Sequence, residues 1–198
     1  MIDYYESVLD VLQKSVDSIK EDEYEKLIIQ CIDVIKKGGK IIASGLGKNV
    51  PICEKFVGTM NSMGVDARFL HTNTAIHGDL GMVREKDLVI LLSKGGNTVE
   101  TVMLAKYLKE RGTNTWLMTF TNHCKSAEII DNQLVMYLEN EGDEWDIMPN
   151  NSTSVYLIVL QGIAVEIGKR MGVALDDFKM NHPGGGIGAK LRGENIWK

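Results

Sequence analysis

Residues 87–111, DLVILLSKGGNTVETVMLAKYLKER, contain the stretch that decides the fold. The run Asp87–Ser93 is almost continuously apolar, which is typical of a strand that is buried on both faces of a sheet. A glycine-rich turn follows, and the segment from Thr98 to Arg111 has the apolar spacing of a helix. A strand, a tight turn and a helix in this order predict one unit of a parallel α/β sheet.

The same alternation continues outward in both directions along the chain. Further strands are predicted at KIIASGLG (40–47), DARFLH (66–71), NTWLMTF (114–120) and QLVMYL (133–138). Helices are predicted at 2–19, 22–37, 49–63, 152–171 and, as a short one, 124–130. Strands that alternate with helices indicate a parallel sheet covered on both sides. We therefore expect one domain over residues 1–198, with N-terminal helices at 1–37 and a C-terminal HPGGGIG tail.

The first predicted helix has an apolar stripe at alternating spacings of three and four residues, as in a packed helix pair. The stripe consists of Ile2, Tyr5, Leu9, Leu12, Val16 and Ile19. Packing on the chain's own core and packing on a partner subunit both explain it. The second alternative predicts a homo-oligomer with this helix at the subunit contact.

Composition limits the classes of function. The chain is 44% apolar and 25% charged, as in an ordinary globular protein, and its net charge of −5 disfavours nucleic-acid and anionic-membrane surfaces. It has no apolar run of about 18 residues and no basic-then-apolar leader, so a cytoplasmic location is expected. The three cysteines form no CxxC pair, which predicts buried thiols rather than disulfides or a zinc site.

Three polar loops stand where a parallel sheet binds its ligands, beyond the carboxyl ends of strands. They are SGLGKN (44–49), SKGGNT (93–98) and NNSTS (150–154). Glycines such as Gly45 and Gly47 let the backbone approach an anion, helix amides and Lys48 attract it, and the hydroxyls of Ser93 and Thr98 donate to it. Each loop alone has a structural explanation, including a capping box between Asn97 and Glu100 in the second loop. Together they predict phosphate binding.

Two further motifs place a histidine among residues that form tight turns. They are HGDLGM (77–82) and NHPGGGIG (181–188), and neither has the periodicity of a helix or a strand. Histidine titrates near neutral pH, so a loop histidine beside glycines suits proton transfer. A purely structural role remains open for both.

With these motifs, the sequence resembles the arabinose-5-phosphate isomerase family of SIS-domain proteins. The matching stretches are SGLGK (44–48), HGDLGM (77–82), SKGGNTVE (93–100), the polar helix start (150–154) and DFKMNHPGGGIG (177–188). The resemblance implies a flavodoxin-like three-layer α/β/α sandwich around a five-stranded parallel sheet. It also implies a dimer or tetramer with its active site between subunits. The implied reaction interconverts D-ribulose 5-phosphate and D-arabinose 5-phosphate without a cofactor or metal.

By motif position, the resemblance implies a catalytic set of Lys48, His77, Glu100 and His182. It implies phosphate contacts from Ser44, Ser93, Thr98, Ser152, Thr153 and Ser154. Aldose–ketose isomerisation moves a proton between two carbons through an enediol and needs a base, an oxygen donor and a grip on the phosphate. Glu100 is the candidate carbon base, the two histidines suit proton transfer at oxygen, and Lys48 suits phosphate or enediolate charge.

Several departures from the family pattern leave the sugar open. The family's regulatory CBS pair after the HPGG motif has no counterpart here, so a short form is expected. Gly95 and Asn97 replace a serine and an acid, Asn49 replaces a serine, and residues 145–150 differ. Lys94 is gained, and we hypothesise that it contacts the phosphate or a second anionic group. Isomerisation of another phosphosugar, such as a hexulose 6-phosphate, and a non-catalytic phosphosugar sensor therefore remain alternatives.

Overall fold

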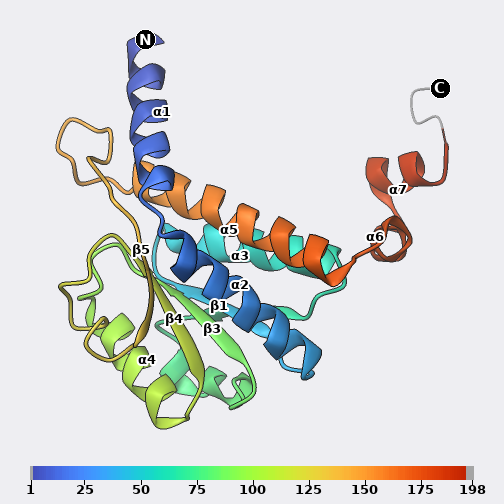
Figure 1. The fold of residues 1–198 in the computed structure, drawn as a ribbon, viewed down its shortest axis with the longest axis horizontal. Helices are drawn as coiled ribbons and strands as arrows, with labels where there is room; N and C mark the ends of the chain where they lie inside the picture. The colour runs from blue at the N-terminus through green and yellow to red at the C-terminus, as the bar shows by residue number, and fades with distance from the viewer. Residues whose placement is uncertain (1, 195–198) are drawn as a thin grey trace.

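The computed structural model describes residues 2–194, and Figure 1 shows their arrangement. Five parallel strands form one sheet in the order β2-β1-β3-β4-β5. The strands are β1 (Ile41–Gly45), β2 (Ala67–His71), β3 (Leu88–Leu92), β4 (Asn114–Thr119) and β5 (Asn132–Val135). The helices are α1 (Ile2–Asp17), α2 (Glu21–Lys36), α3 (Asn49–Ser62), α4 (Val99–Glu110), α5 (Asn151–Met171), α6 (Leu175–Asn181) and α7 (Gly185–Leu191).

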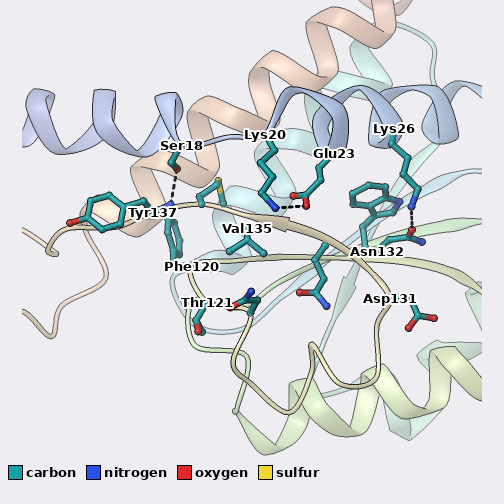
Figure 2. A pocket seen from close by; sticks show the side chains of 14 residues that line it. Ser18, Lys20, Glu23, Lys26, Phe120, Thr121, Asp131, Asn132, Val135 and Tyr137 are labelled. Atoms are coloured by element: carbon teal, nitrogen blue, oxygen red, sulfur yellow. Dashed lines mark hydrogen bonds and ion pairs between the residues drawn. The ribbon is translucent and has the colours of Figure 1, made fainter.

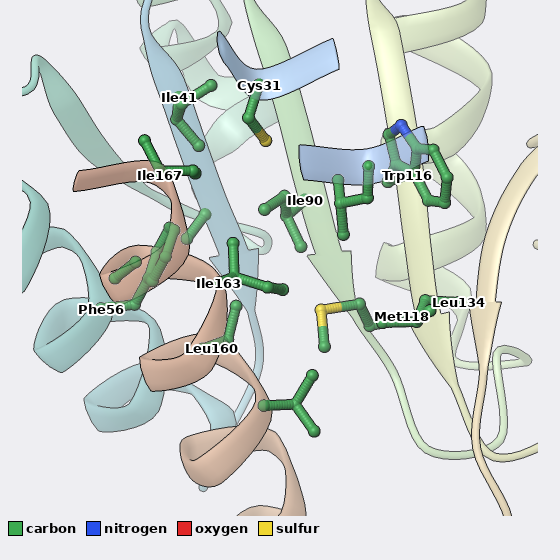
Figure 3. Packing of buried hydrophobic residues seen from close by; sticks show 14 of the residues in the cluster. Cys31, Ile41, Phe56, Ile90, Trp116, Met118, Leu134, Leu160, Ile163 and Ile167 are labelled. Carbon is green, nitrogen blue, oxygen red and sulfur yellow. The ribbon is translucent and has the colours of Figure 1, made fainter. Parts of the chain in front are cut away.

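The central strands are buried on both faces because successive side chains point to opposite sides of the sheet. In β3, Leu88, Ile90 and Leu92 join one apolar cluster, and Val89 and Leu91 join the other. The first cluster is formed with α2, α3 and α5, and Figure 3 shows its centre around Ile90 and Ile163. The second is formed with α4 and the segment after β2. The predicted three-layer sandwich is therefore confirmed.

The two ends of the chain leave the sandwich. The second half of α1 packs on α5, whereas its first turns extend away from the body (Figure 1). The long α5 ends at Gly172, whose φ of 70° gives the left-handed C-cap that glycine favours. Helices α6 and α7 then project from the body as a separate arm (Figure 1).

One local prediction is wrong, and two motifs have a structure that their sequence does not show. Residues 124–130 form turns instead of a short helix, and the Ser126 amide donates to the carbonyl of Gly96 in another loop. The motifs at 77–82 and 181–188, which lack helical periodicity, nevertheless take part in helical structure. The first forms two 3-10 turns, η1 (Ala75–His77) and η2 (Asp79–Met82), and the second joins α6 to α7.

Candidate active site

The loops after β1, β2 and β3 begin side by side at the carboxyl edge of the sheet. Ser44 pairs in register with Leu91 of β3, and its hydroxyl lies 2.8 Å from that of Thr72, just after β2. Both residues are buried, so Ser44 presents its backbone rather than a free hydroxyl to the edge. Asn49 is the first residue of α3, and its side-chain amide donates to the carbonyl of Leu92 at 3.4 Å.

The 93–98 loop is fixed to the segment that leaves β4. The carbonyl of Lys94 accepts from the Phe120 amide at 3.1 Å and from the Thr119 hydroxyl at 3.0 Å. The carbonyl of Gly96 accepts from the Ser126 amide at 3.1 Å. Because these bonds involve the loop's own backbone, its shape is set before any ligand arrives.

The glycine at position 96 is required by this packing. Gly96 has a φ of 60°, and a Cβ added there would lie 2.2 Å from Sγ of Cys124. Gly95, by contrast, has open space around it and keeps an ordinary φ. The loop therefore needs only one of its two glycines for its conformation, and the other leaves room at the exposed edge.

The capping-box explanation of Glu100 is wrong. Helix α4 begins after Thr98 with no side-chain capping bond in the described structure. The side-chain oxygen of Asn97 instead accepts from the Lys125 amide at 2.9 Å and braces the loop from outside. Glu100 is exposed in the first turn of α4, and its carboxylate has no hydrogen-bond role among the described residues.

Glu141, which the sequence analysis missed, fixes the third loop. Its side chain is fully buried, and Oε2 accepts from the amides of Asn150 at 3.1 Å and Ser152 at 2.9 Å. Its Oε1 lies 2.7 Å from Nζ of Lys94. The protein's own carboxylate therefore occupies amides at the start of α5 that a phosphate would otherwise attract.

The hydroxyls of the third loop are also engaged. Thr153 and Ser154 donate to the carbonyl of Asn150, each at 2.9 Å, and Ser152 is buried. Phosphate contacts from these three residues stay predictions, and such contacts require the hydroxyls to exchange partners.

Lys48 and His77 are exposed beside this edge. Lys48 is the last residue before α3, and His77 ends η1 in the segment that leaves β2. That segment is braced by the Thr74 hydroxyl, which donates to the Asp79 carboxylate at 2.8 Å. Lys48, His77 and Glu100 thus come from the segments that follow three neighbouring strands of the sheet.

His182 lies elsewhere in the chain. It directly follows α6, and the neighbouring Asn181 donates to the carbonyl of Ser62 at 3.3 Å, at the far end of α3 from Lys48. The 14 residues of α3 separate its two ends by about 21 Å. The structure therefore brings three of the four predicted catalytic residues to one edge and leaves His182 at the opposite end of a helix.

The His182 ring is nonetheless held in a definite orientation. Its Nδ1 lies 2.8 Å from the carbonyl oxygen of Phe178, and the two rings stack with centroids 3.9 Å apart. Since a carbonyl can only accept, Nδ1 carries the proton in this bond and Nε2 is left available for proton transfer.

A separate pocket of about 570 Å³ lies beside the edge strand β5 (Figure 2). Its two lysines are already partnered, Lys20 with Glu23 at 3.2 Å and Lys26 with Asn132 at 2.8 Å. None of the candidate residues lines this pocket, so the candidate active site is the carboxyl edge of the sheet and not this pocket.

All three cysteines are free and buried as predicted, and burial raises the thiol pKa of Cys31 and Cys53 well above the usual range. Within residues 2–194, no cluster of three or more histidine, cysteine or acidic side chains is arranged to hold a metal ion. No helix in that range is both long and apolar enough to cross a membrane.

The fold and these loops define a class of protein. The model of the SIS domain matches residues 34–167, and the chain therefore belongs to the SIS-domain family. The resemblance to arabinose-5-phosphate isomerases is confirmed by similarity. The chain is 30% identical to arabinose 5-phosphate isomerase KdsD of Salmonella typhi, over 96% of this chain and 58% of that protein. It is 31% identical to KpsF, an arabinose 5-phosphate isomerase of Escherichia coli, over 91% of this chain and 55% of that one.

A solved structure supports the same placement. Escherichia coli CFT073 c3406 in complex with arabinose 5-phosphate superposes with a TM-score of 0.83 at 30% identity, covering 91% of this chain and 94% of that one. The chain spans a little more than half the length of the curated relatives that it matches.

Proposed function

We propose that this protein isomerises a sugar phosphate, interconverting D-arabinose 5-phosphate and D-ribulose 5-phosphate. The observation that carries the proposal is the meeting of the 44–49 and 93–98 loops at the carboxyl edge of the sheet, with Lys48, His77 and Glu100 exposed around them. The names of the relatives supply the sugar, because the groups at the edge support only the binding of a small anion and a proton-transfer reaction.

The proposed roles follow from the position and chemistry of each group. Backbone amides at Gly45 and Gly47, with the Ser93 and Thr98 hydroxyls, bind the phosphate. The exposed carboxylate of Glu100 takes the proton from carbon, and Lys48 stabilises the charge of the enediolate. His77 and His182 move protons at the oxygens of the sugar.

We propose that His182 acts in the active site of a second subunit. Its distance along α3 from Lys48 leaves it unable to complete the site of its own chain, whereas Nε2 is free on an arm that projects from the body. The first turns of α1 support oligomerisation, because Ile2, Tyr5 and Leu9 are 71%, 60% and 65% exposed. Apolar groups in such a row are stabilised by a partner. A dimer or tetramer in the cytoplasm is proposed.

The proposed reaction is tested by assaying turnover with ribulose, arabinose and ribose 5-phosphates and with fructose 6-phosphate. We expect interconversion of the ribulose and arabinose phosphates. Turnover confined to another phosphosugar contradicts the proposed substrate, and tight binding of a phosphosugar without turnover favours a sensor. Light scattering at micromolar concentration tests the assembly separately, and a lone monomer contradicts it.

A further inference from the structure

Lys94 and Glu141 form an ion pair between two of the three predicted phosphate loops. Lys94 lies just after β3, and Glu141 precedes the start of α5. The ammonium Nζ lies 2.7 Å from Oε1 of a carboxylate that is 0% exposed, while the lysine side chain is 45% exposed. The carboxylate of the pair is therefore buried, whereas the lysine side chain reaches the surface at the carboxyl edge of the sheet.

The geometry makes Lys94 the neutralising partner of this carboxylate. Oε2 is satisfied by the Asn150 and Ser152 amides, whereas Oε1 has no partner among the described residues other than the Lys94 ammonium. Lys94 is also the one cation within 4 Å of Glu141 in residues 2–194. Removing it leaves a buried carboxylate with a bare oxygen, which is costly because the charge has lost its hydration without a counter-charge.

The position of the carboxylate gives this neutralisation a consequence for ligand binding. Glu141 holds the amides at the start of α5, and Lys94 belongs to the loop that carries Ser93 and Thr98. An uncompensated negative charge between these loops would repel a phosphate dianion and would free the 93–98 loop from α5. By neutralising Glu141, Lys94 thus opposes both the repulsion of the phosphate and the release of the 93–98 loop, without contacting the ligand.

We propose that Lys94 is a positioning residue that holds and neutralises Glu141, so that the edge of the sheet accepts a phosphate. This rests on the proposed function, because a phosphosugar is taken to bind between these loops. The role differs from the direct phosphate contact predicted from the sequence, since the ammonium is already engaged with the carboxylate.

The two roles are separated by a rescue experiment with Lys94→Met, Glu141→Gln and the double variant. Binding of arabinose 5-phosphate and of inorganic phosphate is measured by calorimetry at low salt, so that turnover does not enter. We expect Lys94→Met alone to weaken binding about tenfold or more, and the double variant to return to within about threefold of the wild type. A double variant as weak as Lys94→Met overturns the proposal and favours direct contact.

Controls distinguish this result from misfolding and from a wrong function. Lys125→Met removes an exposed lysine near the same edge and should leave binding unchanged within about twofold. Thermal unfolding should show the same rescue, with Tm lowered in Lys94→Met and recovered in the double variant. If Lys94→Met does not fold, Lys94→Arg must bind like the wild type, and weak binding by this charged variant overturns the proposal. If the wild type binds no phosphosugar, the proposed function fails, while the Tm cycle still tests the pair.

Discussion

The carboxyl edge of the sheet and the C-terminal arm differ in how well hydrogen bonds and burial fix them to the rest of the chain. At the edge, the 93–98 loop is bonded through its own carbonyls, and the start of α5 is held by a buried carboxylate. The arm of α6 and α7 touches the body through contacts such as Asn181 with Ser62 and buries little except around Gly188 and Ala189. Under the proposed function this difference corresponds to a division of labour, in which the edge of one chain binds the phosphate and the arm supplies His182 to the site of a second chain.

The largest expected effect is at Glu100, at the carboxyl edge of the sheet. We expect Glu100→Gln to abolish isomerisation, a loss of about 10³-fold or more in kcat, while phosphosugar binding survives. The matched control is Glu110→Gln, an exposed acid at the other end of α4, which should keep its activity. Turnover at the wild-type rate in Glu100→Gln would remove Glu100 from the mechanism.

The next effect tests the division of labour itself. His182→Asn should be inactive alone, and so should Glu100→Gln. When the two are co-expressed and mixed oligomers are isolated by two tags, each pair of chains combines an intact Glu100 with an intact His182. About half of the wild-type turnover should then return, since one site of each two is complete. Mixed oligomers without turnover would place His182 in the site of its own chain, whereas a His182→Asn variant that is active alone would place it outside the chemistry.

A smaller effect, on stability, tests how strongly side-chain packing fixes the 93–98 loop. Gly96→Ala places a Cβ against Cys124 and forces a left-handed backbone on alanine, which should cost about 2–4 kcal/mol of the free energy of unfolding. Gly95→Ala enters open space and should change it by less than about 0.5 kcal/mol. Denaturant unfolding of the two variants makes the comparison, and equal costs would contradict the observed loop packing.

The sequence predicted the edge better than the arm for physical reasons. Strands such as β3 are buried on both faces, so their apolar runs are visible in the sequence alone. The role of Glu141 was not predictable, because its partners lie 9 and 11 residues onward and 47 residues back and meet it only in space. The location of His182 was not predictable either. No periodicity marks α6, and the motif around His182 determines local turns but not the direction of the arm.

The smallest effect is expected at Phe178, on the arm. Its ring stacks on His182, and its main-chain carbonyl holds Nδ1, so Phe178→Leu removes the first contact and keeps the second. The imidazole would remain protonated on the same nitrogen but would lose part of its fixed orientation. We therefore expect kcat to fall about 3–10-fold with KM unchanged, because the proposed phosphate-binding loops lie elsewhere.

Phe178→Tyr keeps the stacking ring and should have the wild-type kcat. Met180→Leu, at an 82% exposed position of the same helix, should leave it untouched. An unchanged kcat in Phe178→Leu would mean that the carbonyl alone orients the histidine, whereas a rise in KM would link the arm to the phosphate grip and weaken the contrast between the two regions.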